Sequence, residues 1–363
     1  MGFKLAKIGI ISGGSFGTAI SYAINDDNKV TLHIRKDSTY KGKRLIDIIK
    51  EERVNIKYAD NRVLKKNVDV SSDEIGILRD SDISIITLPA QSIAGMFNKK
   101  IHLPSECIVV SCSKGLVVDG DKYHVSEILE DKLGVANDKI GVMFGPNFAK
   151  QLVKNVPSSG VCAFKDVDIA DYVVGVFDKN ILNLKTSTEV KSLEYFAAIK
   201  NVISIILGIY DTWEKELNFE SNTRAALASK CLSEIVELGQ KLGYNPIVFF
   251  TYAGFGDLFL TAQKGSESRN LKIGQEIKEM ESKLLSRFIP NYLQLSRQKK
   301  GENGVFSKFK REKLELAEGI YTLKKIISLA DSNNMRMPIT NLGYQVLYKN
   351  LNSKKAVFDM VYK

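Results

Sequence analysis

The sequence predicts an α/β fold, with a doubly wound parallel sheet in the first half of the chain and a mostly helical second half. At 363 residues the chain is longer than one hydrophobic core usually supports, so two domains are expected. Five short apolar runs in the first half are separated by helix-like stretches, which is typical of buried parallel strands. These runs span residues 8–11, 30–34, 83–88, 108–110 and 140–144.

Two further runs, residues 161–164 and 182–184, are expected to extend the sheet. From about residue 191 the apolar side chains recur with helical spacing and predict one helix around residues 193–209 and another over 225–242. A domain boundary is therefore expected near residue 190. Between residues 283 and 313 the helical period weakens and polar residues dominate, so a long excursion is expected there.

Composition and charge exclude several classes of protein. Hydrophobic residues make up 44% and charged residues 26%, which is ordinary globular usage and argues against disordered and fibrous proteins. The net charge of +10 favours an anionic partner. Residues 297–313 hold seven basic and two acidic side chains, so half of that excess lies in one local basic segment. A nucleic-acid surface is not expected from so local a patch.

The beginning of the chain offers no membrane or secretion signal, because the apolar run 8–11 is too short for a signal-peptide core or a membrane span. A cytoplasmic protein without a transmembrane segment is expected. The cysteines and histidines show neither a paired disulfide framework nor the spacing of a zinc site, so reduced structural thiols and no metal are expected. They are Cys107, Cys112, Cys162 and Cys231, with His33, His102 and His124.

A glycine-rich turn follows the first apolar run and leads into a helix of small residues. Its core is Gly14-Ser15-Phe16-Gly17. Backbone amides at such a turn and helix N-terminus bind the pyrophosphate of a dinucleotide. In the G-x-G-x-x-G pattern the second and third glycines are present, but Ser12 occupies the first position. A purely structural strand-to-helix turn is the alternative.

The second apolar run ends in Arg35-Lys36. A basic residue at this place tolerates the 2′-phosphate of NADP, whereas an acidic residue would hold the ribose hydroxyl of NAD. NADP is therefore expected to be accepted or preferred. The alternative is a solvated charge pair at a strand end.

Lys200 lies within an apolar helical stretch, with Phe196, Ala197 and Ile203 three and four positions away. Loss of hydration disfavours the charged form of a lysine and suits it to exchange a proton. The alternative is a side chain that extends to solvent, with Asn201 as a surface residue.

Asp257 follows a flexible Gly254-Phe255-Gly256 turn, where a carboxylate either orients a lysine or caps the next helix. Ser268-Arg269-Asn270 opens another helix, and there free amides and a guanidinium form either a phosphate site or an ordinary capped start.

Two loops follow apolar runs, one around Lys114 and one from Gly145 through Asn147 to Ala149. Ligands of open parallel sheets bind beyond the carboxyl ends of the strands, so both loops are expected at one crevice. Plain turns are the alternative.

Taken in order, these segments resemble the NAD(P)-dependent glycerol-3-phosphate dehydrogenase family over nearly the whole chain. The ordered set is Ser-Lys-Gly-Leu, Gly-Pro-Asn-Phe-Ala, Lys-Asn-Val, Gly-Phe-Gly-Asp-Leu, Ser-Arg-Asn and Glu-Gly, and the similarity extends to Pro338-Ile339-Thr340. Each motif is modest alone, but chance agreement of the set is improbable.

The resemblance implies an oxidoreductase that interconverts dihydroxyacetone phosphate and sn-glycerol 3-phosphate with NAD or NADP, supplying glycerol 3-phosphate for phospholipid synthesis. It implies a Rossmann-type dinucleotide-binding domain over residues 1–190 and a helical substrate-binding and catalytic domain over 191–363, with the active site between them. The family expectation is a cytoplasmic homodimer.

By the same resemblance, Lys200 is the catalytic proton donor or acceptor, supported by Asp257 and Lys114. Those three residues also match substrate-binding positions, together with Gly145, Asn147, Ser268, Arg269 and Asn270. The cofactor-binding positions are matched by Gly14, Ser15, Phe16, Gly17, Arg35, Lys114, Ala149, Arg269 and Glu318.

Three features depart from the family pattern. Ser12 replaces the first glycine, which puts the turn and the cofactor affinity in doubt, and Gln151 stands where a glutamate is common. The basic stretch within residues 283–313 is longer than expected, and a solvated loop is favoured over a lid, a subunit contact or a lipid-facing patch. Rival hypotheses are another two-domain hydroxy-acid or phospho-sugar dehydrogenase, a catalytically silent cofactor-binding module, and a nucleic-acid binder.

Overall fold

The computed structural model describes residues 5–96, 100–117, 119, 121–288 and 317–362. The chain forms two compact units. The first unit comprises Met1–Lys114, Val118–Glu194 and Ile247–Asp257, and the second comprises Gly115–Val117, Tyr195–Pro246 and Leu258–Lys363. The domain boundary expected near residue 190 stays a prediction.

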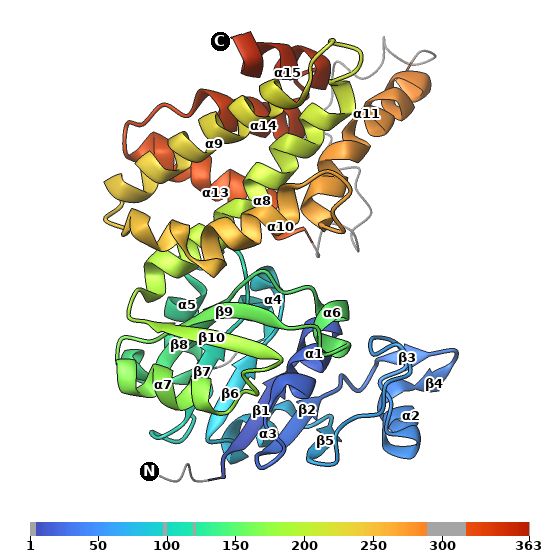
Figure 1. Ribbon diagram of the computed structural model, residues 1–363, viewed down its shortest axis with the longest axis vertical. Helices are drawn as coiled ribbons and strands as arrows, with labels where there is room; N and C mark the ends of the chain where they lie inside the picture. Colours follow the sequence, from blue (N-terminus) through green and yellow to red (C-terminus); the bar gives the residue numbers. More distant parts are fainter. Residues whose placement is uncertain (1–4, 97–99, 118, 120, 289–316, 363) are drawn as a thin grey trace. The chain divides into compact units, whose positions relative to one another are not determined.

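An eight-stranded sheet forms the centre of the first unit (Figure 1). Its strands are ordered β10-β9-β8-β7-β6-β1-β2-β5. All seven expected strands are confirmed. They are β1 (Lys7–Ile11), β2 (Lys29–His33), β6 (Ile83–Ile86), β7 (Ile108–Ser111), β8 (Ile140–Phe144), β9 (Ser158–Ala163) and β10 (Leu182–Ser187).

The strand order reverses between β1 and β6, because the chain first adds β2 and β5 (Val68–Ser71) on one side and then returns to add β6, β7 and β8 on the other. These six parallel strands have the order of a dinucleotide-binding α/β fold. Ligands of such sheets bind outside the carboxyl ends of the strands at this switch point. The turn after β1 and the loop after β6 are therefore the two segments at the switch.

The sheet departs from the predicted all-parallel arrangement at β9, which pairs antiparallel with β8. The connection between them contains only the short helix α6 (Ala149–Val153), whose five residues span about 8 Å. A parallel return would have to cross back along a strand of about 16 Å, which this helix is too short to do. Strand β10 then pairs parallel with β9.

Helices cover both faces of the sheet, which explains why its strands read as continuous apolar runs. On β1, Ile8 and Ile10 belong to a buried cluster that includes Ile20 of α1 (Ser15–Ala23). The alternate residue Gly9 lies against Ile77 of α3 (Glu74–Asp80), where a Cβ would meet the isoleucine at 2.6 Å. The remaining helices of this unit are α2 (Leu45–Glu52), α4 (Ala90–Met96), α5 (Val125–Leu133) and α7 (Val167–Gly175).

Three strands were not expected from the sequence: β5 and the hairpin of β3 (Thr39–Tyr40) with β4 (Lys43–Arg44). The hairpin strands are two residues long and exposed or half-exposed, so they carry no apolar pattern. Strand β5 lies at the edge of the sheet and mixes Val68 and Val70 with polar residues.

The second unit is helical, as predicted. Its helices α8 (Val190–Trp213) and α9 (Ser221–Lys241) confirm the two expected helical periods. They are followed by α10 (Asp257–Ala262), α11 (Arg269–Phe288), α13 (Glu318–Ser332), α14 (Pro338–Lys349) and α15 (Ser353–Tyr362). Because α11 continues to Phe288, the expected excursion is wrong over residues 283–288, and residues 289–313 lie outside the described residues.

By length and composition, α8 is the one helix within the described part of the chain that is apolar enough to cross a membrane, with a mean hydropathy of 1.5. That stretch is entirely buried within the protein. It is therefore the central helix of a folded core, and its apolar character follows from burial.

Candidate active site

The turn after β1 is formed even though a serine replaces its first glycine. Ser12 adopts φ +83°, a conformation that glycine adopts without cost and other residues rarely adopt. Its carbonyl oxygen accepts a hydrogen bond from Thr87 Oγ1 at 2.8 Å. A Cβ on Gly17 would overlap that same oxygen, so helix α1 can approach the turn only with glycine at position 17.

The N-terminus of α1 is open to a ligand. Gly14 precedes the helix, and a Cβ there would have no neighbour nearer than Ser12 Oγ at 3.7 Å. Ser15 is exposed and Phe16 is half-buried against the core. Glycine at position 14 is therefore not required by packing within the protein, and the space above it fits the close approach of a pyrophosphate to the backbone.

Asn55 holds the turn from behind, and sequence reasoning missed it. Its side chain is fully buried, and its Nδ2 donates to the Gly13 carbonyl at 3.1 Å and to Thr18 Oγ1 at 2.8 Å. No local signal separates it from its neighbours, because Asn61 and Asn67 also lie between α2 and β5 and an asparagine there is equally typical of a loop.

The end of β2 presents cations to solvent. Arg35 and Lys36 are exposed, and the Arg35 guanidinium lies 3.5 Å from Asp37 with 73% of its side chain accessible. The adjacent hairpin adds Lys43 and Arg44, both exposed. Cations at the end of β2 suit an additional phosphate on the adenosine ribose.

Lys114 and Asp257 form an ion pair within the first unit. Lys114 Nζ lies 2.6 Å from Asp257 Oδ2 and donates to the Gly145 carbonyl oxygen at 2.9 Å. The Asp257 side chain is 2% exposed and that of Lys114 is 17% exposed. Of the two roles considered for Asp257, this contact matches the one in which the carboxylate orients a lysine. Asp257 is also the first residue of α10.

The loop after β8 joins this pair, so the structure gathers four of the predicted substrate residues. Asn147 donates its backbone N–H to the Gly145 carbonyl and its side-chain amide to the Ser159 carbonyl at 3.0 Å. A Cβ on Gly145 would press on Gly160 at 2.7 Å, so the loop needs glycine there. Ala149 begins α6 directly after this loop.

In the second unit, Lys200 is buried on α8 at 5% exposure, and Asn201 beside it is 4% exposed. The alternative in which Lys200 extends to solvent is therefore wrong. The other seven residues between Tyr195 and Val202 are almost entirely inaccessible. The Lys200 side chain therefore has no path to solvent along this stretch of the helix surface.

The starts of α11 and α13 meet α8 at Asn201. Ser268 caps α11, because its Oγ accepts from the Leu271 N–H at 3.4 Å, and Asn270 Oδ1 accepts from the Gly319 N–H at 3.1 Å. A Cβ on Gly319 would lie 2.7 Å from the Asn201 carbonyl oxygen. Glu318, immediately before Gly319, is thus brought near Asn270, while Arg269 remains exposed.

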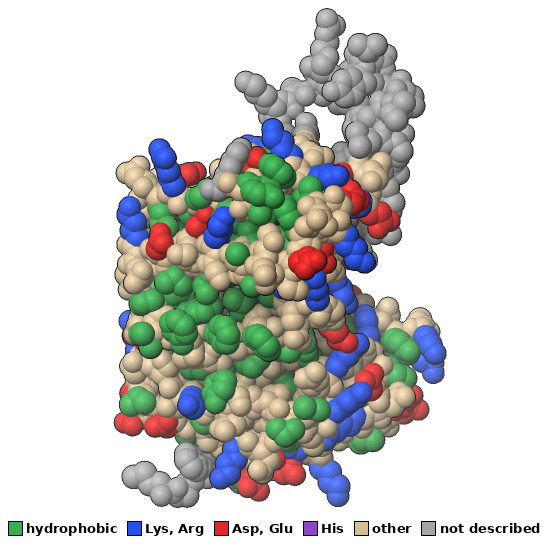
Figure 2. All heavy atoms as spheres, turned by 45° about the horizontal axis from the view of Figure 1, so that its top comes forward, with side chains coloured by type: hydrophobic (Ala, Val, Ile, Leu, Met, Phe, Trp, Pro, Cys, Tyr) green, Lys and Arg blue, Asp and Glu red, His purple; other side chains and the backbone are tan. Residues whose placement is uncertain are grey.

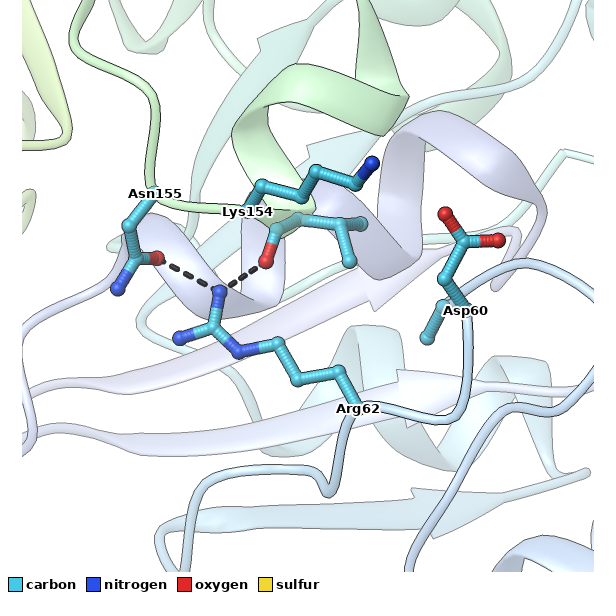
Figure 3. A pocket seen from close by; sticks show the side chains of 6 residues that line it. Asp60, Arg62, Lys154 and Asn155 are labelled. Atoms are coloured by element: carbon cyan, nitrogen blue, oxygen red, sulfur yellow. Dashed lines mark hydrogen bonds between the residues drawn. The ribbon is translucent and has the colours of Figure 1, made fainter.

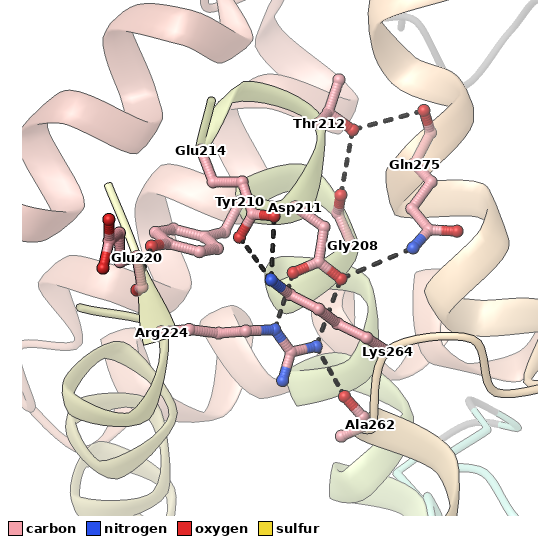
Figure 4. A network of polar contacts seen from close by, with 10 residues as sticks. All are labelled: Gly208, Tyr210, Asp211, Thr212, Glu214, Glu220, Arg224, Ala262, Lys264 and Gln275. Atoms are coloured by element: carbon pink, nitrogen blue, oxygen red, sulfur yellow. Dashed lines mark hydrogen bonds and ion pairs between the residues drawn. The ribbon is translucent and has the colours of Figure 1, made fainter. Parts of the chain in front are cut away.

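A polar network in the same unit supports this segment (Figure 4). Arg224 pairs with Asp211 at 2.6 Å and donates to the Ala262 carbonyl oxygen, which ends α10. Lys264 pairs with Glu214 at 2.8 Å. Both contacts fix the short connection that leads to Ser268, a role for Arg224 that the sequence did not signal.

A hollow elsewhere on the first unit involves none of the predicted site residues. It is lined by Ala59, Asp60, Arg62, Val153, Lys154 and Asn155 (Figure 3). Arg62 donates to Asn155 Oδ1 at 2.8 Å and to the Val153 carbonyl oxygen, so its guanidinium is engaged in holding the end of α6. Ala149 lies at the other end of that helix.

The described ranges contain no group of three metal-binding side chains. All four cysteines are free and buried, which confirms the expected structural thiols. Burial raises the pKa of the Cys112 thiol to about 12 and raises the pKa values of the other three thiols.

Two family models match consecutive parts of the chain. The N-terminal model of the NAD-dependent glycerol-3-phosphate dehydrogenases covers residues 7–170, and the C-terminal model of the same enzymes covers residues 189–358. The chain belongs to the NAD-dependent glycerol-3-phosphate dehydrogenase family. The resemblance inferred from the ordered motifs is thereby confirmed.

Curated members of this dehydrogenase family align over nearly their full length. A glycerol-3-phosphate dehydrogenase [NAD(P)+] of Leptospira biflexa is 32% identical over 354 residues, which are 97% of this chain and 96% of the relative. An enzyme of the same name from Staphylococcus aureus is 28% identical over 361 residues, covering 98% of each chain.

Solved structures of glycerol-3-phosphate dehydrogenases share the fold. The enzyme from Coxiella burnetii has a TM-score of 0.77 at 22% identity, covering 99% of both chains. That from Plasmodium falciparum has a TM-score of 0.79 at 21% identity, covering 99% of this chain and 96% of the other. A D-mandelate dehydrogenase matches less well, with a TM-score of 0.57 at 12% identity over 98% of this chain and 100% of the other. The predicted fold class is confirmed.

Proposed function

We propose that the protein interconverts dihydroxyacetone phosphate and sn-glycerol 3-phosphate, using NAD or NADP. The observation that carries the proposal is the Lys114–Asp257 ion pair, which joins residues 143 positions apart in the chain beside Gly145 and Asn147. Burying such a pair carries a desolvation penalty, so its presence at this place supports a local function. In this family those positions match substrate contacts.

The reduction of the ketone requires a hydride at C2 and a proton at the C2 oxygen. When bound, the reduced nicotinamide supplies the hydride. Lys200 donates the proton to the oxygen as negative charge develops there, and accepts it in the reverse direction. The Lys114 ammonium stabilises the developing charge, and Asp257 fixes the position of that ammonium. Arg269, with the amides at the start of α11 and the side chains of Ser268 and Asn270, binds the substrate phosphate.

The cofactor site consists of the turn after β1 and the strand end of β2. Gly14, Ser15, Phe16 and Gly17 receive the pyrophosphate, and the open space above Gly14 supports this assignment. Arg35 favours NADPH over NADH through the 2′-phosphate. Lys114, Ala149, Arg269 and Glu318 complete the proposed set of cofactor contacts.

The cellular role follows from the product. We place the enzyme in the cytoplasm, where it would supply glycerol 3-phosphate for phospholipid synthesis. A homodimer is the family expectation, and exposed apolar side chains support a contact surface: Ile247, Phe250 and Phe255 are 68%, 73% and 51% accessible. Figure 2 shows a face on which apolar side chains gather among scattered cations.

A substrate comparison tests the proposed reaction. Oxidation of NADH and NADPH is followed with dihydroxyacetone phosphate, and with 2-oxo acids and other phosphorylated ketones as rivals. Turnover with dihydroxyacetone phosphate and a higher kcat/KM for NADPH would support the reaction and the role of Arg35. Preference for a 2-oxo acid would favour the hydroxy-acid dehydrogenase instead, and cofactor binding without turnover on any substrate would favour a silent binding module.

A further inference from the structure

The buried Asn55 side chain acts on a single peptide group of the glycine-rich turn. The Asn55 carbonyl oxygen accepts from the backbone N–H groups of Tyr58 and Ala59 at 2.9 Å, so a turn of its own holds the residue in place. Its Nδ2 donates to the Gly13 carbonyl oxygen and to Thr18 Oγ1. Thr18 Oγ1 donates to the same carbonyl oxygen at 3.2 Å. Two buried donors therefore converge on the Gly13 carbonyl.

The backbone of Gly13 is held on its other side as well. Its N–H donates to the His33 carbonyl oxygen at 2.6 Å, and a Cβ on Gly13 would meet that oxygen at 2.7 Å. The Gly13 carbonyl and the Gly14 N–H belong to one planar peptide group, and the described chain contains no cis peptide bond. In a trans peptide these two bonds point in opposite directions. Because the carbonyl points toward Asn55, the Gly14 N–H points away from it.

The direction of this N–H matters because Gly14 precedes α1. Within the described part of the protein the Gly14 N–H has no backbone partner. The first bond of helical spacing runs from the Thr18 N–H to the Gly14 carbonyl oxygen, so the N–H groups of Ser15 and Phe16 have no helical partner either. An anion above Gly14 would meet several backbone donors at once. The orientation of the Gly13–Gly14 peptide decides whether the Gly14 N–H is one of them.

We propose that Asn55 is a positioning residue for the cofactor, because it orients the Gly13–Gly14 peptide so that the Gly14 N–H binds the pyrophosphate. The inference rests on the proposed cofactor site and adds a residue that the glycine-rich motif does not contain. Asn55 is fully buried and acts only through the peptide. A carboxamide suits this role, because it donates to a carbonyl oxygen without placing a charge behind the phosphate site.

A second asparagine of the same connection provides a matched control. Asn67 Nδ2 donates to the carbonyl oxygens of Asn25 and Asn28 at 3.2 and 2.8 Å. The side-chain oxygens of Asn55 and Asn67 are both buried without a hydrogen bond in the described ranges. Asn25 and Asn28 precede the amino end of β2, whereas Gly13 follows the carboxyl end of β1. The two amides therefore hold segments at opposite ends of the parallel strands, and only that of Asn55 reaches the turn.

The test compares Asn55→Leu with Asn67→Leu, since each change replaces the amide by an apolar side chain of similar size and removes two hydrogen bonds. Thr18→Val removes the second donor to the Gly13 carbonyl and is the milder variant if Asn55→Leu does not fold. Calorimetry measures the dissociation constant of ADP, which ends at the pyrophosphate. The KM for NADPH and kcat are measured with dihydroxyacetone phosphate, and melting temperatures are measured without ligand.

Both asparagine variants should melt at a lower temperature, because each loses two hydrogen bonds. Asn55→Leu should weaken ADP by roughly tenfold and raise the KM for NADPH, while kcat at saturating NADPH stays within about twofold. Thr18→Val should show a smaller loss of ADP affinity in the same direction. Asn67→Leu should bind ADP as the unaltered protein does.

Unchanged ADP affinity in the folded variants of Asn55 and Thr18 would overturn the inference and leave the proposed reaction standing. Equal losses of ADP affinity in Asn55→Leu and Asn67→Leu would also overturn it, because general destabilisation would then explain the effect. If the unaltered protein bound neither ADP nor NADPH, the proposed cofactor site would fail together with this inference.

Discussion

Lys114 Nζ and Asp257 Oδ2 lie 2.6 Å apart, although the lysine follows strand β7 and the aspartate is the first residue of helix α10. The pair gives the first unit a fixed cation beside the loop of Gly145. A positive charge held in this way does not need to reorganise when negative charge develops on a substrate oxygen.

Removing both members of this pair should cost less than the two single removals added together. Asp257→Asn removes the carboxylate that lies 2.6 Å from the largely desolvated Lys114 ammonium and should lower the free energy of unfolding by about 3 kcal/mol. In the double variant with Lys114→Met the uncompensated charge disappears, so the cost should be less than the sum of the single changes. Urea unfolding measures all three variants.

An exposed pair provides the control for that cycle. Lys7 and Asp80 lie 2.8 Å apart with 54% and 77% of their side chains accessible, so Asp80→Asn should leave the stability unchanged. Strictly additive costs for Lys114 and Asp257 would contradict the coupling.

Two glycines of the turn should respond differently to a methyl group. Gly17→Ala places a Cβ on the Ser12 carbonyl oxygen and should destabilise the protein by about 2 kcal/mol. Gly14→Ala meets no atom closer than 3.7 Å, so it should leave the melting temperature nearly unchanged and weaken NADPH binding by roughly tenfold or more. Equal effects of the two changes on stability, together with unchanged NADPH affinity in Gly14→Ala, would contradict the roles assigned to these glycines.

Ser12→Gly should stabilise the protein. The serine holds φ +83°, where a side chain costs about 1 kcal/mol relative to glycine, and the change removes that strain. Ser12→Ala keeps the Cβ and therefore should give no such gain. Thermal melts of the two variants decide the point, and an unchanged melting temperature in Ser12→Gly would mean that the turn is not strained.

The four thiols should be unreactive over the working pH range. Burial raises the pKa of Cys112 to about 12 and raises those of the others, and a thiol is protonated below its pKa. An ordinary thiol, with a pKa near 8.5, would react roughly tenfold faster at about pH 8 than at about pH 7. Ellman's reagent should find no fast thiol in the native protein at either pH and four after denaturation. A fast thiol at about pH 8 would disprove this expectation.

The fold could be predicted from the sequence wherever burial was complete. The strands containing Ile8, Ile83 and Ile140 are covered on both faces and read as continuous apolar runs. The edge strand β5 and the hairpin lack that signal because they are exposed on at least one side. The direction of β9 depends on the length of the preceding helix, which a strand pattern does not contain.

The site was predictable as motifs but not as contacts. The sequence marked Lys114 and Asp257 separately, and only the fold brings them together. Residues that hold the site from behind, such as Asn55 and Arg224, carry no local pattern, because their partners are backbone carbonyls of distant segments.

Replacement of Lys200 tests the central claim most directly. Lys200→Met is compared with Lys191→Met, a half-exposed lysine on the same helix, for dihydroxyacetone phosphate reduction and for NADPH binding. If Lys200 transfers the proton, kcat should fall by roughly a hundredfold or more while the dissociation constant of NADPH stays within about twofold. The Lys191 variant should keep its activity. A Lys200 variant that turns over within a few-fold of the unaltered enzyme would contradict the proposed mechanism.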